Sequence, residues 1–336
     1  MAAAVVRGGR EIVASVVHGQ IELHRPYGGV VPELASRDHA RTVSAVVSAC
    51  LERAGIAATS LDGVAVTAGP GLVGSLLVGL SFAKALAYRL GVPLVAVHHL
   101  AGHLASAELA DPTLGPPYVG LVISGGHTAL YRIEAEAPPR LLGETRDDAV
   151  GEAFDKVARL LGLPYPGGPS LSAAAERGDA RAVRLPKPLR GQDARRGVAP
   201  RLDFSFSGLK TAVALEVERR GSLDAAAVAD LAAAFEATAV EALVRRACAA
   251  LRAEGLARLA VVGGVAANRR LRAELGAAAA RDGFQVVFPP PELCTDNAVM
   301  IAAAGSRRLE RGERDALDVG CFSRVRLDAS PWFGPG

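Results

Sequence analysis

The chain has 336 residues, enough for two domains of ordinary size or one large domain, each with a proper core. Half of it is hydrophobic, mainly Ala, Val and Leu, and aromatic residues make up 4%, a composition that suits α/β layers. The net charge of +3 is too small to establish a polyanionic partner. The four cysteines are far apart and form no C-x-x-C pair, which argues against a zinc ribbon, an iron–sulfur cluster or a disulfide framework.

No apolar run in the sequence is typical of a membrane span or a secretory signal. The longest obvious run, Leu72–Ala87, is interrupted by glycine, serine and lysine. The first residues lack a basic start followed by a continuous apolar stretch. We therefore expect a cytoplasmic protein with no membrane partner.

In chain order, the first half predicts strands that end in glycine turns. The expected elements are a strand within Gly63–Gly71, a helix over Val73–Tyr88, a strand over Leu94–Val97, a hairpin of Tyr118–Ser124 with His127–Arg132, and a helix over Asp148–Leu161. The Gly125-Gly126 pair predicts a tight hairpin turn with positive φ.

The second half repeats this pattern after a long Ala-rich helix, which Ser222 can cap and which reaches about Glu254. The expected elements are strand Arg258–Val262, helix Asn268–Ala280, strand Gln285–Phe288 and helix Asp296–Arg311. Two such halves predict an active site in the cleft between them, beyond the carboxyl ends of the strands. The boundary is expected near Asp111–Pro117, where Pro and Gly cluster.

The segment Gly69–Gly74 matches G-x-G-x-x-G, the pattern of a dinucleotide-binding turn. A Rossmann site needs an acid at the end of the next strand, but that strand ends in His98 and His99. NAD binding is therefore rejected. Either the glycines let a backbone approach a phosphate, or they serve strand–helix packing alone.

The sharpest chemical signal is His98-His99-Leu-Ala-Gly-His103, which holds three of the seven histidines. On a helix, His99 and His103 stand at i and i+4, so one metal ion can reach both imidazoles. Positions 100–102 hold no glutamate, so the general base of an H-E-x-x-H metalloprotease is absent.

Asp296 lies at the start of the last long helix and could complete a site of two histidines and one carboxylate, a set that suits iron(II) or zinc. On spacing alone, a helix cap is the stronger interpretation of Asp296, although Thr295 could be the cap instead.

Two further glycine turns follow strands, in Ser124–Thr128 and Gly263–Asn268. Both can offer backbone amides to an anion and short polar side chains to a sugar. Asp155 is expected at the same end as Tyr165–Gly168, where a carboxylate could accept ribose hydroxyls. Taken singly, each is more often a turn or a solvated acid.

Basic residues cluster between Arg181 and Arg201, where the single acid is Asp193. They are Arg181, Arg184, Lys187, Arg190, Arg195, Arg196 and Arg201. The cluster is either a set of phosphate contacts or a solvated loop.

Together these segments resemble one family, the tRNA N(6)-adenosine threonylcarbamoyltransferases, formerly called glycoprotein endopeptidases. The resemblance runs from about Ala2 to Phe322. Its motifs are Gly28–His39, Gly69-Pro-Gly-Leu72, His98–His103, Val122–Thr128, Gly151–Lys156, Tyr165–Pro169, Phe204–Lys210, Gly263–Asn268 and Cys294–Asn297.

The resemblance implies a two-lobed α/β fold of the actin-like and sugar-kinase-like class, a duplicated ribonuclease-H-like fold with a central cleft. Residues 1–112 would form the N-terminal lobe, completed by a C-terminal helix over 296–325, and residues 113–295 the C-terminal lobe.

The resemblance also implies the site residues. His99, His103 and Asp296 would hold one divalent metal ion, Fe²⁺ before Zn²⁺ or Mg²⁺. The threonylcarbamoyl-adenylate would be bound by Val122, Ile123, Ser124, Gly125, Gly126, Asp155, Gly168 and Asn268.

The implied reaction is acyl transfer from the adenylate to the exocyclic amine of the adenosine beside the anticodon, in tRNAs that read codons beginning with A; AMP leaves. The implied partners are tRNA, a degenerate paralogue and a small ATPase. The helix around Glu33–Ala54 is the expected contact for the paralogue.

Three alternatives belong to other classes. A metal-dependent peptidase would share His99 and His103 but lacks its base. A sugar or acid kinase of the same fold has no need of a two-histidine metal site. A scaffold paralogue without activity would be expected to lack the histidines.

The start of the chain departs from the family pattern. Ala2–Ile12 matches the family's second strand, so a first strand of about a dozen residues, whose polar end faces the nucleotide phosphates, is expected upstream. Without it we expect an unpaired sheet edge, lower solubility and weak adenylate binding.

Overall fold

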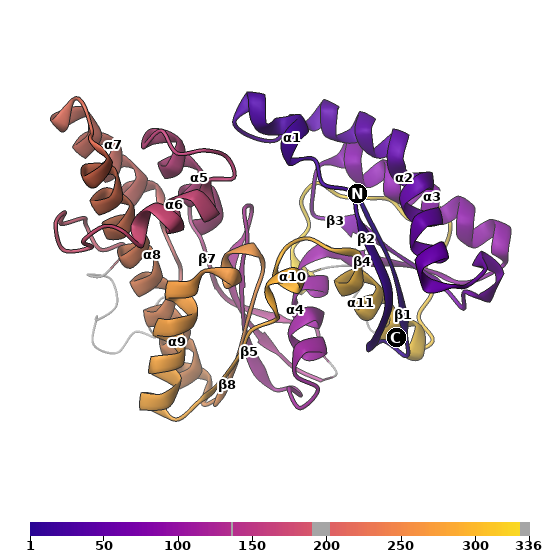
Figure 1. The fold of residues 1–336 in the computed structure, drawn as a ribbon. Coiled ribbons are helices and arrows are strands. Elements are labelled where there is room, and N and C mark those ends of the chain that lie inside the picture. Colours follow the sequence, from indigo (N-terminus) through magenta and orange to yellow (C-terminus); the bar gives the residue numbers. More distant parts are fainter. Residues whose placement is uncertain (136, 190–201, 330–336) are drawn as a thin grey trace. The chain divides into compact units, whose positions relative to one another are not determined.

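The computed structural model describes residues 1–135, 137–189 and 202–329 (Figure 1). Two compact units are formed: Met1–Pro112 together with the residues from Thr295 onward, and Thr113–Cys294. The first unit is therefore built from both ends of the chain, and the second unit is one continuous segment.

The first unit contains two small sheets and the helices that cover them. Strand β1 (Ala2–Arg7) pairs antiparallel with β2 (Glu11–Val17), and β3 (Val64–Gly69) pairs parallel with β4 (Leu94–His98). The helices are α1 (Ile21–His24), α2 (Pro32–Ala54), α3 (Val73–Leu90), α4 (His99–Ala110) and α11 (Ala298–Glu310), and the 3-10 turns are η1 (Arg25–Tyr27), η2 (Ala58–Ser60) and η5 (Leu327–Ala329).

Helices α3 and α11 cover opposite faces of β3. A side chain at Gly79 of α3 would contact Val66, and one at Gly305 of α11 would collide with Ala65. Successive strand residues point to opposite faces, so the two helices sandwich the strand. Helix α11 also packs on α4, which brings the C-terminal residues back to the N-terminal half of the unit.

The first unit is less tightly covered around β1. Each residue of Ala2–Val6 is only half-buried, and among the described residues β1 forms a strand ladder only with β2 and β3 only with β4. The expectation of a strand before Ala2 stays a prediction.

The second unit contains a five-stranded sheet in the order β7-β6-β5-β8-β9. The strands are β5 (Tyr118–Ile123), β6 (Thr128–Ile133), β7 (Arg140–Glu144), β8 (Arg258–Val262) and β9 (Gln285–Val287). The helices are α5 (Val150–Leu160), α6 (Gly167–Ala175), α7 (Ser207–Arg220), α8 (Ala225–Glu254), α9 (Arg269–Asp282) and α10 (Pro291–Cys294), with the 3-10 turn η4 (Gly264–Ala267).

The core of this unit forms between β5, β8 and α8. Every residue of β5 is buried, because β5 is paired on both edges, antiparallel to β6 and parallel to β8. Helix α8 packs against β5, β6 and β8, and it buries alanines, leucines and Phe235. The α/β fold predicted from the sequence is confirmed.

Several local predictions were wrong. The side chain that caps α8 is that of Asp224, which accepts from Ala227 N at 2.8 Å, and not that of Ser222. Neither Gly125 nor Gly126 has a positive φ; the hairpin is closed by Ser124, whose N donates to His127 O at 2.8 Å and whose Oγ accepts from His127 N at 3.2 Å. Helix α11 spans 298–310, so residues 296–325 are not one helix; residues 312–329 contain turns and the short 3-10 segment η5.

Among the described residues, one helix, α3, is long and apolar enough to span a membrane, and 17% of it is buried. Length and composition alone do not distinguish such a helix from one in a soluble protein. In the structure it packs against α2 and β3 inside an α/β unit.

Candidate functional site

The first unit brings His99, His103 and Asp296 together. Nε2 of each histidine lies 3.4 Å from Asp296 Oδ1, and the ligand atoms of all three residues lie within 4.8 Å of one another. The two imidazole rings meet edge to face with centroids 4.7 Å apart. This is a possible metal site with two nitrogen donors and one carboxylate.

The neighbouring His98 has a structural role. It caps α4: its Nδ1 accepts from Leu100 N at 3.1 Å, so its Nε2 carries the proton and donates to Val325 O at 3.1 Å. Capping fixes where α4 begins and places His99 and His103 one turn apart on the same face. Of the three clustered histidines, two remain for a metal.

The capping interpretation of Asp296 was wrong. Asn297 is the N-cap of α11, since its Oδ1 accepts from Met300 N at 2.9 Å while its Nδ2 donates to Thr295 O at 2.8 Å. The Asp296 carboxylate is left to face the histidines, and its side chain is 77% exposed. A carboxylate in this position can accept a metal ion that arrives from solvent.

His103 is a buried polar residue of the first unit whose ring nitrogens lack good hydrogen-bond partners. Its side chain is fully buried, neither ring nitrogen makes a hydrogen bond of good geometry, and Nε2 has only the long 3.4 Å contact with Asp296 Oδ1. Burial lowers the pKa of His103 despite the nearby Asp296, so the ring is held neutral, the form that binds metals. A metal ion would satisfy a nitrogen that is otherwise buried without a partner.

Asp296 is correspondingly held as an anion. Desolvation by the surrounding protein atoms would by itself raise the pKa of the Asp296 carboxyl group. The contacts with His103 and His99 outweigh this effect and keep the pKa well below its usual range. The donor set therefore consists of two imidazoles and an ionised carboxylate, which fits a divalent metal of the iron or zinc type.

In the second unit, Val122 and Ile123 differ from the other predicted substrate residues. Both are fully buried strand residues of β5, so their side chains belong to the core. Side chains built at Gly125 and Gly126, in contrast, would meet nothing within 4 Å. The open part of this loop is the glycine turn, and a ligand could contact its backbone.

The start of helix α5 packs against the backbone of the Ser124–Gly126 turn. Thr128 Oγ1 accepts from Val150 N at 2.8 Å, and a side chain at Gly151 would lie 2.6 Å from Ser124 O. The glycine at 151 is required because the start of α5 packs directly on the turn backbone.

Asp155 and Gly168 also lie together, as predicted for one binding surface. Gly168 N donates to Asp155 Oδ1 at 3.2 Å. A side chain at Gly167 would lie 2.6 Å from Asp155 Cα, so this glycine permits α6 to approach α5. Desolvation raises the pKa of the Asp155 carboxyl group, and the amides of Gly168 and Gly167 partly offset the effect.

Asn268 follows the turn after β8 and caps α9, with its Oδ1 accepting from Leu271 N at 2.8 Å. Its Nδ2 donates to Ser172 Oγ at 3.0 Å and to Glu236 Oε1 at 2.7 Å. Ser172 and Glu236 were not found from the sequence, because nothing in the local pattern of α6 or α8 marks them.

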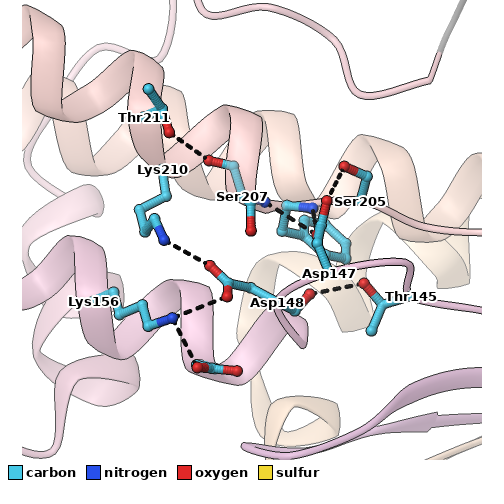
Figure 2. Close-up of polar contacts among 10 residues, drawn as sticks. Thr145, Asp147, Asp148, Lys156, Ser205, Ser207, Lys210 and Thr211 are labelled. Carbon is cyan, nitrogen blue, oxygen red and sulfur yellow. Dashed lines mark hydrogen bonds and ion pairs between the residues drawn. The ribbon is translucent and has the colours of Figure 1, made fainter.

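A second network missed from the sequence surrounds two adjacent acids (Figure 2). Asp147 Oδ1 accepts from Phe206 N at 2.7 Å and Ser207 N at 3.2 Å, at the start of α7. Asp148 accepts from Lys156 Nζ at 2.9 Å and Lys210 Nζ at 3.0 Å. Both lysines end motifs seen in the sequence, Gly151–Lys156 and Phe204–Lys210, and the network holds α7 to α5.

The basic cluster is only partly within the described residues. Lys187 pairs with Glu241 at 2.6 Å, whereas Arg190, Arg195, Arg196 and Arg201 lie outside the described ranges.

Comparison with known proteins identifies the family. A family model described as tRNA N6-adenosine threonylcarbamoyltransferase matches residues 11–303. Proteins of that name are 53% identical over 328 residues in Anaeromyxobacter dehalogenans (97% of this chain, 96% of the relative) and 51% identical over 337 residues in Sorangium cellulosum (97% and 93%). This chain belongs to the tRNA N6-adenosine threonylcarbamoyltransferase family. Family members are named as transferases, so the chain is an enzyme of this class.

Solved structures of distant proteins share the fold alone. HypF of T. kodakarensis superposes with a TM-score of 0.59 at 16% identity, covering 80% of this chain and 43% of that chain. Full-length HypF in the phosphate- and nucleotide-bound form gives 0.57 at 15% identity, covering 77% and 49%.

Proposed function

We propose that this chain transfers the threonylcarbamoyl group from threonylcarbamoyl-AMP to N6 of the adenosine beside the anticodon, in tRNAs that read codons beginning with A. AMP is the leaving group. The observation that carries the proposal is the match to the named family over residues 11–303.

The metal would be held by His99, His103 and Asp296, and iron(II) is the proposed ion. When bound, such an ion polarises an acyl or phosphoryl oxygen as a Lewis acid. The neutral state of His103 and the anionic state of Asp296 support this assignment, because both residues are already in the protonation state that a metal ligand needs.

The adenylate would be bound by residues of the second unit. We assign the phosphate to backbone amides of the Ser124–Gly126 turn, since small residues there leave the backbone open. We assign a ribose hydroxyl to Asp155, whose second carboxylate oxygen can accept while Oδ1 receives Gly168 N. Val122 and Ile123 would contribute backbone alone, and Asn268 would act through the turn it closes.

The aryl amine of adenine is a poor nucleophile, so these residues would act mainly by orienting the two reactants and stabilising developing charge. No residue is assigned as the acceptor of the amine proton.

The remaining partners follow from the same assignment. The proposal places the enzyme in the cytoplasm with tRNA, a degenerate paralogue and a small ATPase. The paralogue would contact α2, and the exposed apolar residues Leu77 and Tyr88 on the adjacent α3 support a protein partner at this surface.

The peptidase alternative is disfavoured by the packing of α4. In an H-E-x-x-H peptidase the base directly follows the first histidine, and that position is held by Leu100, whose apolar side chain is buried in α4. A kinase is disfavoured because phosphoryl transfer does not require two histidine ligands.

The test is reconstitution of the reaction. The chain is incubated with partner subunits, tRNA, threonine, bicarbonate and ATP, and digested tRNA is analysed by mass spectrometry for threonylcarbamoyl-adenosine. A second arm supplies synthetic threonylcarbamoyl-AMP in place of threonine, bicarbonate and ATP. Absence of the modified nucleoside in both arms, with a chain that is folded and metal-loaded, would overturn the proposal.

A further inference from the structure

Asn268 uses both hydrogens of its amide group, and one acceptor position of its oxygen, inside the second unit. Nδ2 carries two hydrogens and has two acceptors, Glu236 Oε1 at 2.7 Å and Ser172 Oγ at 3.0 Å, while Oδ1 accepts from Leu271 N. The orientation of the amide is determined, because a carboxylate can only accept and a backbone N–H can only donate. A ligand could not receive either amide hydrogen without breaking one of these bonds.

Glu236 is an unusual residue for its position. It lies in the middle of α8, beside the fully buried Phe235, and is itself only 6% exposed. Phe235 packs edge to face on Phe154 with ring centroids 5.1 Å apart, so this part of α8 is fixed in the core. A buried carboxylate needs donors, and Asn268 supplies one from another element.

The turn that Asn268 closes is itself in contact with the other proposed binding turn. Gly263 has φ of +95° and a side chain there would collide with Ile123 O. Gly263, at the start of the turn that Asn268 closes, therefore lies directly on the end of β5, where the Ser124–Gly126 turn begins. Any movement of this turn would alter the backbone to which the adenylate phosphate is assigned.

We infer that Glu236 is a positioning residue for adenylate binding: from the core of α8 it holds the Asn268 amide, with Ser172 of α6 as the second anchor, and thereby fixes the turn after β8 against the glycine turn after β5. The inference rests on the proposed function, since it takes the adenylate as the ligand of these turns.

The experiment measures AMP binding by calorimetry and steady-state kinetics with synthetic threonylcarbamoyl-AMP in the reconstituted complex. Glu236→Ala should raise the Kd for AMP and the KM for the adenylate by about tenfold, and kcat should change by less than about twofold. Glu236→Gln keeps a carbonyl oxygen as acceptor, so both constants should stay within about threefold of the unmodified chain. Glu241→Ala is the matched control on the same helix, because Glu241 pairs with Lys187 outside the network.

A double-mutant cycle separates positioning from a general loss of structure. If Glu236 acts through Asn268, the double variant Glu236→Ala with Asn268→Ala should bind AMP within about twofold of Asn268→Ala alone. If Glu236→Ala does not fold, Ser172→Ala removes the second anchor from a half-buried position and should weaken AMP binding by about threefold.

The inference is overturned if Glu236→Ala is folded and binds AMP normally, or if Glu236→Gln is as impaired as Glu236→Ala. It is also overturned if the losses of AMP affinity caused by Glu236→Ala and Asn268→Ala multiply in the double variant, or if Ser172→Ala leaves the affinity for AMP unchanged. Failure of the proposed function looks different: the unmodified chain itself would bind no adenylate and form no modified nucleoside.

Discussion

At the scale of single residues, three histidines close together in the chain have different roles. His98 is used by its own helix as a cap, while His99 points toward Asp296 and His103 is buried one turn further on without a hydrogen-bond partner. This difference follows from the start of α4: the residue before a helix can bond its free amides, and the residues on its first two turns cannot.

We predict that His103→Ala abolishes tight metal binding, because it removes one of three protein ligands. Thermal stability measured without metal should also fall, because removing a fully buried imidazole leaves a cavity, but the loss of metal affinity should far exceed this change in folding stability. Metal content is measured beside thermal melting. His98→Asn is the control: it keeps an acceptor at the cap and should retain the metal. Full metal occupancy in folded His103→Ala would contradict the ligand assignment.

Metal removal from the unmodified chain gives a second prediction. An ion that binds only the folded state stabilises it, by about 2.7 kcal/mol when its free concentration is about a hundred times its Kd. Chelation should therefore lower the melting temperature of the unmodified chain and leave that of His103→Ala unaffected. Equal shifts in the two proteins would show that the chelator acts elsewhere.

At the scale of elements, the network of Asp147 and Asp148 determines how α7 joins its unit (Figure 2). Asp147 caps the amides at the start of α7, and Asp148 binds one lysine from α5 and one from α7. These contacts link two helices that are separated in the chain by α6 and by residues 176–206. We therefore expect the packing of α7 on α5 to depend on these side chains.

We predict a pH-dependent loss of stability in Asp148→Asn. Burial alone would raise the pKa of this carboxyl group, but hydrogen bonds from Lys156, Lys210 and Ser207 lower it. A depressed folded-state pKa stabilises the fold above the ordinary carboxyl pKa, about 4, and the contribution disappears as the pH falls through the lower folded-state value. The variant should cost about 1–3 kcal/mol at neutral pH, and the difference should vanish in strong acid.

The measurement is denaturant unfolding of both proteins across the acid range. Asp203→Asn is the control, because Asp203 pairs with Arg146 at a more exposed site and should cost less. A difference that is constant with pH would contradict the charge-based explanation.

At the scale of the whole molecule, charge distribution bears on the tRNA partner. The net charge of +3 gives no strong attraction, so any phosphate contacts must come from local clusters such as Arg181–Arg201. Of the three members that the structure describes, Arg181, Arg184 and Lys187, Lys187 is paired with Glu241. Arg195 and Arg196 lie in the sequence outside the described ranges, and their role stays a prediction.

Replacing Arg195 and Arg196 by Ala should weaken binding about equally for all tRNA sequences and reduce the slope of log affinity against log salt by up to about 2, because each lost phosphate contact releases one counterion fewer. Filter binding over a salt series measures both quantities. Arg219→Ala with Arg220→Ala is the charge-matched control, since both residues pair with Glu216. An unchanged slope would assign the cluster to a solvated loop.

The sequence by itself determined the family, the α/β class, most strand and helix positions and the pairing of His99 with His103. These depend on local periodicity, on glycine and proline at turns, and on motif order, all of which are written along the chain. It could not decide whether Asp296 was a cap or a ligand, because the two uses place the same residue type at the same distance from a helix.

Tertiary structure excluded the cap, because Asn297 has that role, and it placed Asp296 beside His99 and His103 by packing α11 against α4, while the ligand role of Asp296 stays a proposal. It also joined Ser172, Glu236 and Asn268, which belong to separate helices and carry no shared local signal. Contacts between residues distant in sequence depend on how the helices pack in three dimensions. The sequence pattern predicts which face of a helix is buried, but it does not predict which element packs against that face.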